Sequence, residues 1–244
     1  MWNRAAIKEN GKANMKKNYW NSVLVAVIYS LFVGGAGATF SRNFSSGDQE
    51  SNIDWSNPDA AAIALLILGA LGIGFTIGLI VKIVLLNPLN VGCSRFFVVN
   101  QSEQAMVNEL GYAFKQNFGQ SLLAMLLSQL AIGLGFCLFI IPGIILSYSY
   151  RMVPYILAQE PHVGVVETLQ RSRAMMRGNK WNAFVFDLSF IGWHLLAVLT
   201  CGILEIFYVA PYFQNANAGL YIAIRDLFDG GQGQNNVVGT QTQQ

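Results

Sequence analysis

Lys82, Arg151 and Asp187 carry ionisable side chains within stretches of sequence that are otherwise apolar. A charged side chain at membrane depth is costly, so each of the three is a candidate functional residue. Opposite charges at that depth usually pair with each other. We therefore expect Asp187 to form an ion pair with Arg151 or with Lys82.

Three interpretations of these charges stay open, and in the third Asp187 relays protons. In the first, the ion pair fixes helix packing and Lys82 extends to the membrane interface. In the second, a polar cavity opens to the cytoplasm, and a spare positive charge there attracts a phosphate or carboxylate. Nearby amide side chains would add hydrogen bonds to that cavity: Gln214, Asn215 and Asn217.

Sequence motifs for enzymatic chemistry do not occur in this chain. It has no GxSxG, HExxH or P-loop motif, and no GxGxxG that opens a helix. Cys93, Cys137 and Cys201 lie far apart, and His162 and His194 are isolated, so we expect no metal site and no disulfide framework. We predict a protein that is not an enzyme and needs no cofactor.

The composition indicates a membrane protein. Hydrophobic residues make up 53% of the 244 residues and charged residues only 11%, whereas soluble domains carry about 25% charged residues. The net charge of +2 and the lack of a long basic and aromatic strip give no indication of nucleic-acid binding.

Six apolar stretches are predicted as transmembrane helices, because a bilayer core is crossed by about 20 helical residues. The uncharged run Gln116–Tyr150 is too long for one span and is divided at Ile141-Pro142-Gly143. For the first stretch a cleavable signal peptide is the alternative. The predicted spans are Asn18–Ser41, Ala60–Val81, Ser121–Ile140, Gly143–Ala158, Trp181–Ile203 and Ile206–Ile224.

The distribution of lysine and arginine gives an independent test of this topology, since cytoplasmic loops are enriched in both. With both termini in the cytoplasm, every basic residue except Arg42, that is 14 of 15, lies at or near the cytoplasmic face. We predict an all-α polytopic helix bundle in a bacterial inner membrane. A basic cytoplasmic segment (1–17) precedes the six-span domain (18–225), and a flexible polar tail (226–244) follows it.

Amphipathic segments are expected at the cytoplasmic surface. Ser102–Phe118 and Pro161–Lys180 place apolar residues on one side, and basic residues recur every four positions from Arg4 to Lys16. Such segments lie in the headgroup plane and attract anionic lipids. The expected partners are therefore the lipid bilayer and its anionic headgroups, with a membrane protein or a second copy of the chain in addition.

Three stretches of the second half carry a resemblance to a known family: SYSYRMVPYILAQEP (Ser147–Pro161), ETLQRSRAMMRGNKWNAFVFDLSFIGWHLL (Glu167–Leu196) and APYFQNANAGLY (Ala210–Tyr221). NPLNVGCSRFF (Asn87–Phe97) is similar in layout. Together they resemble the bacterial membrane-protein family catalogued as domain of unknown function 975. The resemblance implies a multi-spanning membrane protein, mostly from Gram-positive bacteria, with no assigned reaction and no catalytic residues to transfer.

The sequence supports three hypotheses about function. The first is a non-enzymatic structural or accessory membrane component that acts through helix or lipid contacts. The second is a transporter of a small solute or lipid-like substrate through the polar cavity. The third, an intramembrane enzyme, has the least support, because only one polar cluster lies at membrane depth.

Overall fold

The computed structural model describes residues 2–33, 58–116 and 118–241, and for residues 58–61, 63, 64, 67, 75 and 231–241 it describes the backbone alone. The described residues form helices and contain no strand, which confirms the predicted all-α class. The π-helical turns are η1, η2 and η4, and η3 is a 3₁₀ helix. The elements in chain order are α1 (Arg4–Lys17), α2 (Tyr19–Ile28), η1 (Tyr29–Val33), α4 (Pro58–Val81), η2 (Lys82–Leu86), α5 (Asn87–Val99), η3 (Val107–Gly111), α6 (Tyr112–Lys115), α7 (Phe118–Leu138), α8 (Ile140–Ser149), α9 (Val153–Gln159), α10 (Val165–Met175), α11 (Lys180–Leu188), α12 (Ile191–Leu199), η4 (Glu205–Val209) and α13 (Ala210–Gln241).

Four helical segments of the described chain are long and apolar enough to cross a membrane: Leu68–Val99, Phe118–Leu138, Ile140–Gln159 and Lys180–Leu199. The predicted count of six is not confirmed. Of the first predicted span, Tyr19–Phe32 is a shorter apolar helix, and residues 34–57 lie outside the described part.

Two predicted span ends differ from the structure. The second predicted span, Ala60–Val81, continues further than expected, because η2 leads directly into α5 and the helix passes Pro88 just after this π-helical turn. The last predicted span, Ile206–Ile224, forms η4 and the start of α13 but is not among the four apolar segments. Its polar residues lower its hydropathy, and they are buried by neighbouring helices.

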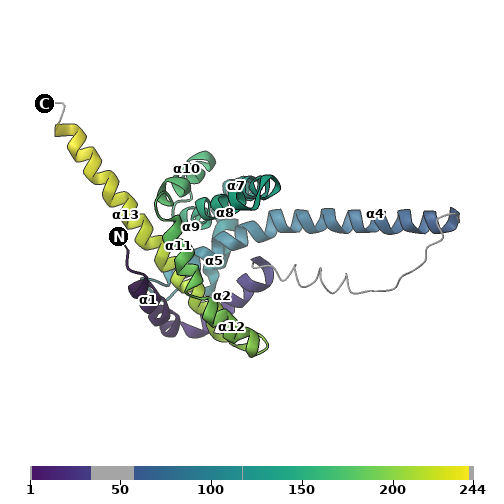
Figure 1. Cartoon of the computed structure of the whole chain (residues 1–244), viewed down its shortest axis with the longest axis horizontal. Helices are drawn as coiled ribbons and strands as arrows, with labels where there is room; N and C mark the ends of the chain where they lie inside the picture. Colours follow the sequence, from purple (N-terminus) through teal and green to yellow (C-terminus); the bar gives the residue numbers. More distant parts are fainter. Residues whose placement is uncertain (1, 34–57, 117, 242–244) are drawn as a thin grey trace.

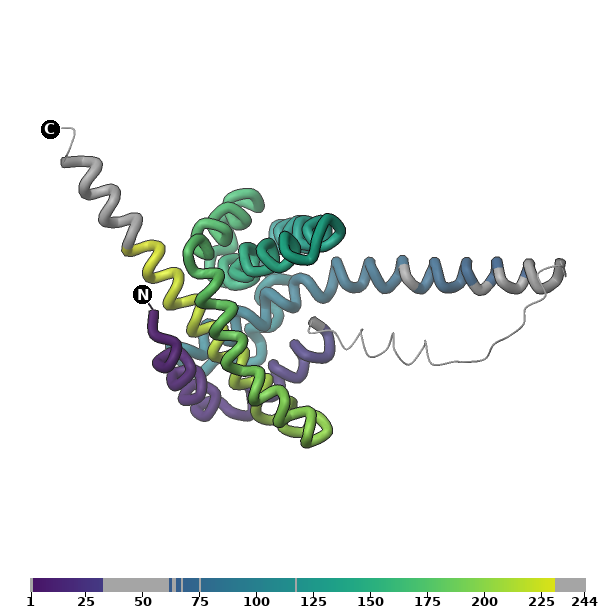
Figure 2. The backbone as a smooth tube through the Cα atoms, in the orientation of Figure 1, coloured from purple at the N-terminus to yellow at the C-terminus, as the bar shows by residue number. Residues whose placement is uncertain are grey.

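Helix α13 is the centre of the bundle. Ala216, Leu220 and Tyr221 on it are fully or almost fully buried, and α1 packs against it (Figures 1 and 2). A Cβ on Gly11 of α1 would lie 2.8 Å from the backbone Cα of Ala216, so only glycine permits this close approach. The helix continues to Gln241, beyond the predicted start of the polar tail at residue 226.

The predicted amphipathic segments are organised differently from the expectation. Ser102–Phe118 contains η3 and the short α6 in place of one helix, and Met106 is exposed while Leu110 is buried. In α10, Val166 is 62% exposed and the buried face contains Thr168 and Ser172. The contact of α10 with α7, α9 and α13 explains the difference: its inner face meets protein and not lipid.

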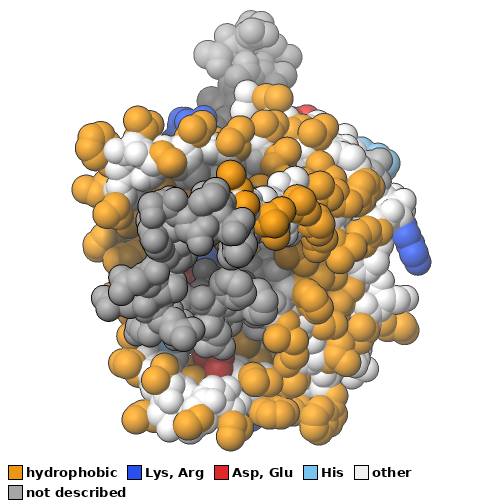
Figure 3. Space-filling model, turned by 90° about the vertical axis from the view of Figure 1, so that its right-hand side faces the viewer, with side chains coloured by type: hydrophobic (Ala, Val, Ile, Leu, Met, Phe, Trp, Pro, Cys, Tyr) orange, Lys and Arg blue, Asp and Glu red, His pale blue; other side chains and the backbone are white. Residues whose placement is uncertain are grey.

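The two ends of the molecule differ in polarity. α1, α10 and both termini lie on one side of the bundle, and α4 projects from the other (Figure 1). On the side from which α4 projects, most of the coloured side chains that surround the undescribed residues are hydrophobic (Figure 3). The turns of the α7/α8 and α12/η4 hairpins also expose large apolar residues: Leu138, Phe139, Ile140, Ile141, Leu199 and Ile203.

Candidate functional site

Arg151 and Asp187 form a two-point ion pair. Nη1 of Arg151 donates to Oδ2 of Asp187 at 2.6 Å, and Nη2 donates to Oδ1 at 2.7 Å. Two neighbours hold the pair in place: the hydroxyl of Tyr148 donates to Oδ2 of Asp187 at 2.8 Å, and Nη2 of Arg151 also donates to Oδ1 of Asn217 at 2.6 Å. Charged, two-point hydrogen bonds of this kind fix geometry as well as contributing energy.

Arg151 lies in a break between α8 and α9. Pro154 lies near the start of α9, and a proline there removes an N–H and clashes with the carbonyl four residues earlier, so α8 cannot continue through it. Ser172 of α10 satisfies part of the interrupted backbone, since its hydroxyl donates to the carbonyl oxygen of Ser149 at 2.8 Å. The break therefore exposes the arginine at the helix junction without leaving that carbonyl unpaired.

Asp187 lies beside a second break. Ser189 and Phe190 separate α11 from α12, and Lys8 closes the end of α11 from outside. Nζ of Lys8 is 3.3 Å from the carbonyl oxygen of Ser189 and 4.6 Å from the centre of the Phe190 ring. Partial desolvation lowers the pKa of Lys8. This lysine is therefore a helix cap, although the sequence placed it in a lipid-facing basic stripe.

The ion pair borders a cavity of about 400 Å³. The side chains of Arg151 and Asp187 are 17% and 28% exposed, so both keep contact with this space. The polar part of the remaining wall is neutral and is supplied by η1, α5, α8, α9 and α13: Tyr29, Asn90, Ser94, Ser147, Tyr155 and Gln214. In the described part of the chain, no group of three or more His, Cys, Asp and Glu side chains could hold a metal ion.

The predicted polar cluster is only partly assembled. Arg151, Asp187, Gln214 and Asn217 meet at the cavity, as the sequence suggested. Lys82 does not, because it is exposed on η2 and does not line the cavity. The cavity therefore lacks the spare positive charge that the sequence analysis assigned to it.

Asn215 belongs to a separate network of amide side chains, because successive helical residues point in different directions. Its Oδ1 accepts from Nδ2 of Asn100 at 2.8 Å, and its carbonyl oxygen accepts from Nε2 of Gln101 at 2.9 Å. Asn18 donates to Oδ1 of Asn100 at 2.9 Å, and Asn14 donates to Oε1 of Gln101 at 2.9 Å. The network joins α1, α2, the end of α5 and α13, and the spacing of single Asn and Gln residues did not reveal it.

Asn100→Ala is expected to lower the free energy of unfolding by about 1–3 kcal/mol, because it removes the donor to Oδ1 of the fully buried Asn215. Asn100 itself is 1% exposed. Thermal unfolding of the purified protein in detergent measures the effect. Asn10→Ala, at an exposed position of α1, is the control and should change little. Equal stability of the two variants would contradict a structural role for the network.

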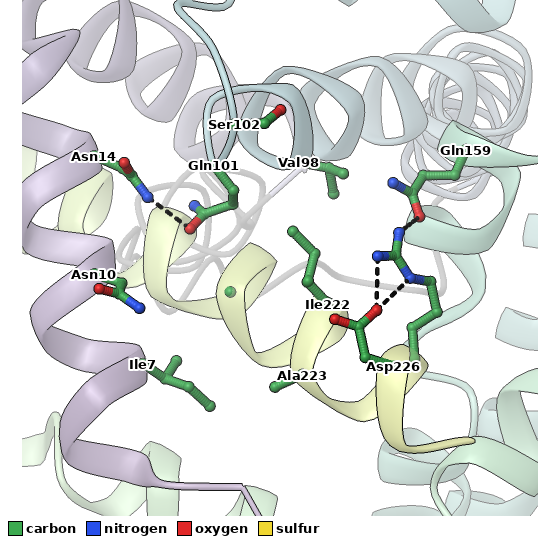
Figure 4. Close-up of a pocket in the computed structure, with 12 residues that line it drawn as sticks. Ile7, Asn10, Asn14, Val98, Gln101, Ser102, Gln159, Ile222, Ala223 and Asp226 are labelled. Carbon is green, nitrogen blue, oxygen red and sulfur yellow. Dashed lines mark hydrogen bonds and ion pairs between the residues drawn. The ribbon is translucent and has the colours of Figure 1, made fainter. Parts of the chain in front are cut away.

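A second, larger cleft of about 670 Å³ lies among α1, α5, α9 and α13 (Figure 4). Nη1 of Arg225 donates to Oε1 of Gln159 at 2.7 Å, and Nη2 donates to Oδ1 of Asp226 at 2.7 Å. Asn14 and Gln101 bond to each other across its other side (Figure 4). The charged side chains of this cleft are Arg225 and Asp226, which pair with each other, and Asp226 is 61% exposed.

Exposed basic residues remain at the end of the molecule that carries α1 and α10. Within the described chain these residues form no ion pair that would neutralise them: Arg4, Lys12, Lys16, Lys17, Arg173 and Arg177. Such a surface attracts anionic headgroups.

Comparison with known proteins bears on the second half of the chain. Residues 136–227 match the model of the family described as "Protein of unknown function (DUF975)". This segment includes Arg151, Asp187 and Asn217, and so contains the complete ion-pair cluster. Neither the comparison with curated proteins nor that with solved structures gives a match.

Proposed function

We propose that this chain, which belongs to the DUF975 family, is a non-enzymatic structural or accessory component of a bacterial inner membrane. The observation that carries the proposal is the amount of apolar side chain left on the outside of the helices. The described side chains of α4 face away from the bundle, and large residues on it are more than half exposed: Leu65, Leu66, Leu68, Leu71, Ile73, Ile77 and Ile80. Contiguous apolar surface of this kind is suited to lipid or to another transmembrane helix.

The orientation with both termini in the cytoplasm is supported by the location of the basic residues. α1 carries lysines and α10 carries Arg173, and both helices lie on the side of the bundle away from the projecting α4 (Figure 1). Lipid headgroups with negative charge are the partners that fit this surface.

Two native cysteines provide a test of the orientation. Cys137 and Cys201 are exposed, and they lie near the end of α7 and in the turn after α12, while Cys93 is buried. A membrane-impermeant thiol reagent applied to intact cells should label Cys137 and Cys201. In a variant that keeps only an introduced Arg173→Cys cysteine, labelling should require permeabilised cells. Labelling of Arg173→Cys in intact cells would reverse the orientation, and release of the protein by an alkaline wash would contradict membrane insertion.

A transporter of a small solute or lipid-like substrate is the second candidate function, and the cavity beside Arg151 and Asp187 favours it. In the proposed orientation, Lys180 and Gln159 are the cytoplasmic ends of their apolar segments. At 1.5 Å per helical residue, Asp187 lies about 10 Å from Lys180, and Arg151 lies about 12 Å from Gln159. In the proposed orientation the ion pair lies nearer to the cytoplasmic surface than to the outer one. A substrate would enter the cavity from that side.

Filling the cavity separates the two candidates. Ser147 lines it, and its hydroxyl donates to the carbonyl three residues earlier, Ile144. Ser102 lines the other cleft and donates in the same way to Val99, so Ser102→Leu is a matched control for Ser147→Leu. In a strain lacking the gene, a structural component should still complement with Ser147→Leu. A transporter should fail with Ser147→Leu at normal protein amount and succeed with Ser102→Leu.

A further inference from the structure

The cavity beside the ion pair contains one positive and one negative side chain and no other charged group among the described residues that line it. Its wall therefore has no net charge, but it does have a strong local dipole from Arg151 to Asp187. A simple anion would be attracted to the arginine and repelled by the aspartate at similar range, and a simple cation would meet the reverse. Only a ligand with both charges matches both side chains.

We propose that this cavity binds a compact zwitterion, with the ligand's carboxylate or phosphate on the Arg151 side and its ammonium on the Asp187 side. The proposal deepens the second candidate function and rests on it, because it names the class of substrate. Alpha-amino acids and phosphoethanolamine headgroups share this chemistry: an ammonium group a few bonds from an anionic group.

The pair is held ready for such a ligand. Tyr148 and Asn217 each hydrogen-bond one member, so neither charged group needs to reorganise when a ligand arrives. Nε of Arg151 has no acceptor within the described part of the chain and remains available as a donor. Preorganised charges of this kind cost little entropy on binding.

Irregular backbone around the cavity is a second, independent observation. The α8/α9 break lies at Arg151, the α11/α12 break follows Asp187, and the π-helical turn η1 begins at Tyr29, which also lines the cavity. At membrane depth, interrupted helices are tolerated where they are buried in protein or line a water-filled space. Discontinuous helices form the substrate sites of many transporters, and π-helical turns occur frequently at functional sites.

The size of the cavity limits the ligand. At about 400 Å³ it is at the small end of the range for ligand pockets. Asn90, Ser94 and Gln214 supply neutral hydrogen-bonding groups, and Phe213 supplies an apolar wall. This combination suits a ligand with two charges and a short side chain or linker.

The test uses the full chain in nanodiscs of phosphatidylglycerol and measures thermal unfolding. Alanine, propionate and ethylamine are compared at equal concentration, since the last two each retain one of alanine's charged groups. Alanine at saturation should raise Tm by about 3 °C or more, and propionate and ethylamine should not. Equal shifts from alanine and propionate would overturn the proposal and indicate an anion site.

A second arm distinguishes a free solute from a lipid headgroup. If the natural ligand is a headgroup, nanodiscs that contain phosphatidylethanolamine should raise Tm and abolish the response to alanine. No shift from alanine, O-phosphoethanolamine or phosphatidylethanolamine would overturn the zwitterion site.

Cavity variants link any shift to this site. Ser147→Leu should remove the ligand-induced shift while leaving the unliganded Tm near that of the wild type, and Ser102→Leu should retain the shift. A shift that survives Ser147→Leu would place the ligand elsewhere and refute the proposal. The complementation experiment tests the transport function separately. If Ser147→Leu fails to complement and no zwitterion raises Tm, the transport function would still be supported, but its ligand would not be a zwitterion.

Discussion

Asp187→Ala is expected to lower the free energy of unfolding by up to about 3–5 kcal/mol, the cost of breaking a fully buried ion pair, because the largely buried Arg151 would lose its counter-charge. In this protein the orphaned group would be Arg151, which donates two of its three hydrogen bonds to Asp187. Such a loss is a large fraction of the stability of a typical protein. Quantitative immunoblotting of membranes and thermal unfolding of the purified variant measure it.

The matched control is Asp226→Ala, which removes the acidic member of another Arg–Asp pair. Asp226 is 61% exposed and accepts from its neighbour Arg225. An exposed pair contributes only about 0–1 kcal/mol, so this variant should accumulate as the wild type does. Similar losses in both variants would show that the depth and geometry of the Arg151–Asp187 pair have no special importance for folding.

Gly92→Ala is expected to lower the free energy of unfolding by disturbing the packing of α5. Gly92 is buried where α5 crosses the chain at Leu110, and a Cβ there would overlap the carbonyl oxygen and the carbonyl carbon of Leu110. The obstacle is backbone, so no side-chain rotation relieves it. Overpacking of this kind costs about 1–3 kcal/mol, or more where backbone must shift. Thermal unfolding and protein amount in membranes again report the effect.

Gly119→Ala in α7 is the comparison for Gly92→Ala, because a Cβ at Gly119 meets no atom within 4 Å. Alanine favours a helix over glycine by about 0.8–1 kcal/mol, so this variant should be as stable as the wild type or more stable. If Gly92→Ala were equally well tolerated, α5 and the segment around Leu110 would not be packed as closely as the structure has them.

The ion pair can stabilise the fold and also bind a ligand, but the two roles require different neighbouring residues. A pair that serves packing alone is often replaceable by apolar residues without loss. This pair is bordered by a cavity, broken helices and neutral polar side chains. These features do not improve packing, and they are suited to a binding site.

The class of the protein was predictable from the amino-acid sequence. Long uncharged stretches have to leave water, and in hydrocarbon the backbone satisfies its hydrogen bonds within helices, so the all-α fold followed from composition and from the length of these stretches. It also indicated that Asp187 would need a basic partner at membrane depth, and the structure supplies Arg151. Both conclusions rest on solvation, which depends on residue type and local pattern.

The sequence did not reveal which polar residues meet, because that depends on how the helices pack. Lys82, Gln214 and Asn215 looked equivalent in the sequence, yet only Gln214 borders the cavity: Lys82 lies on the outward-facing η2, and Asn215 points to Asn100 on α5. The direction of each side chain depends on the rotation of its helix and on the breaks at Arg151 and beside Asp187. Those are set by contacts between segments far apart in the chain, for which a single sequence contains no local pattern.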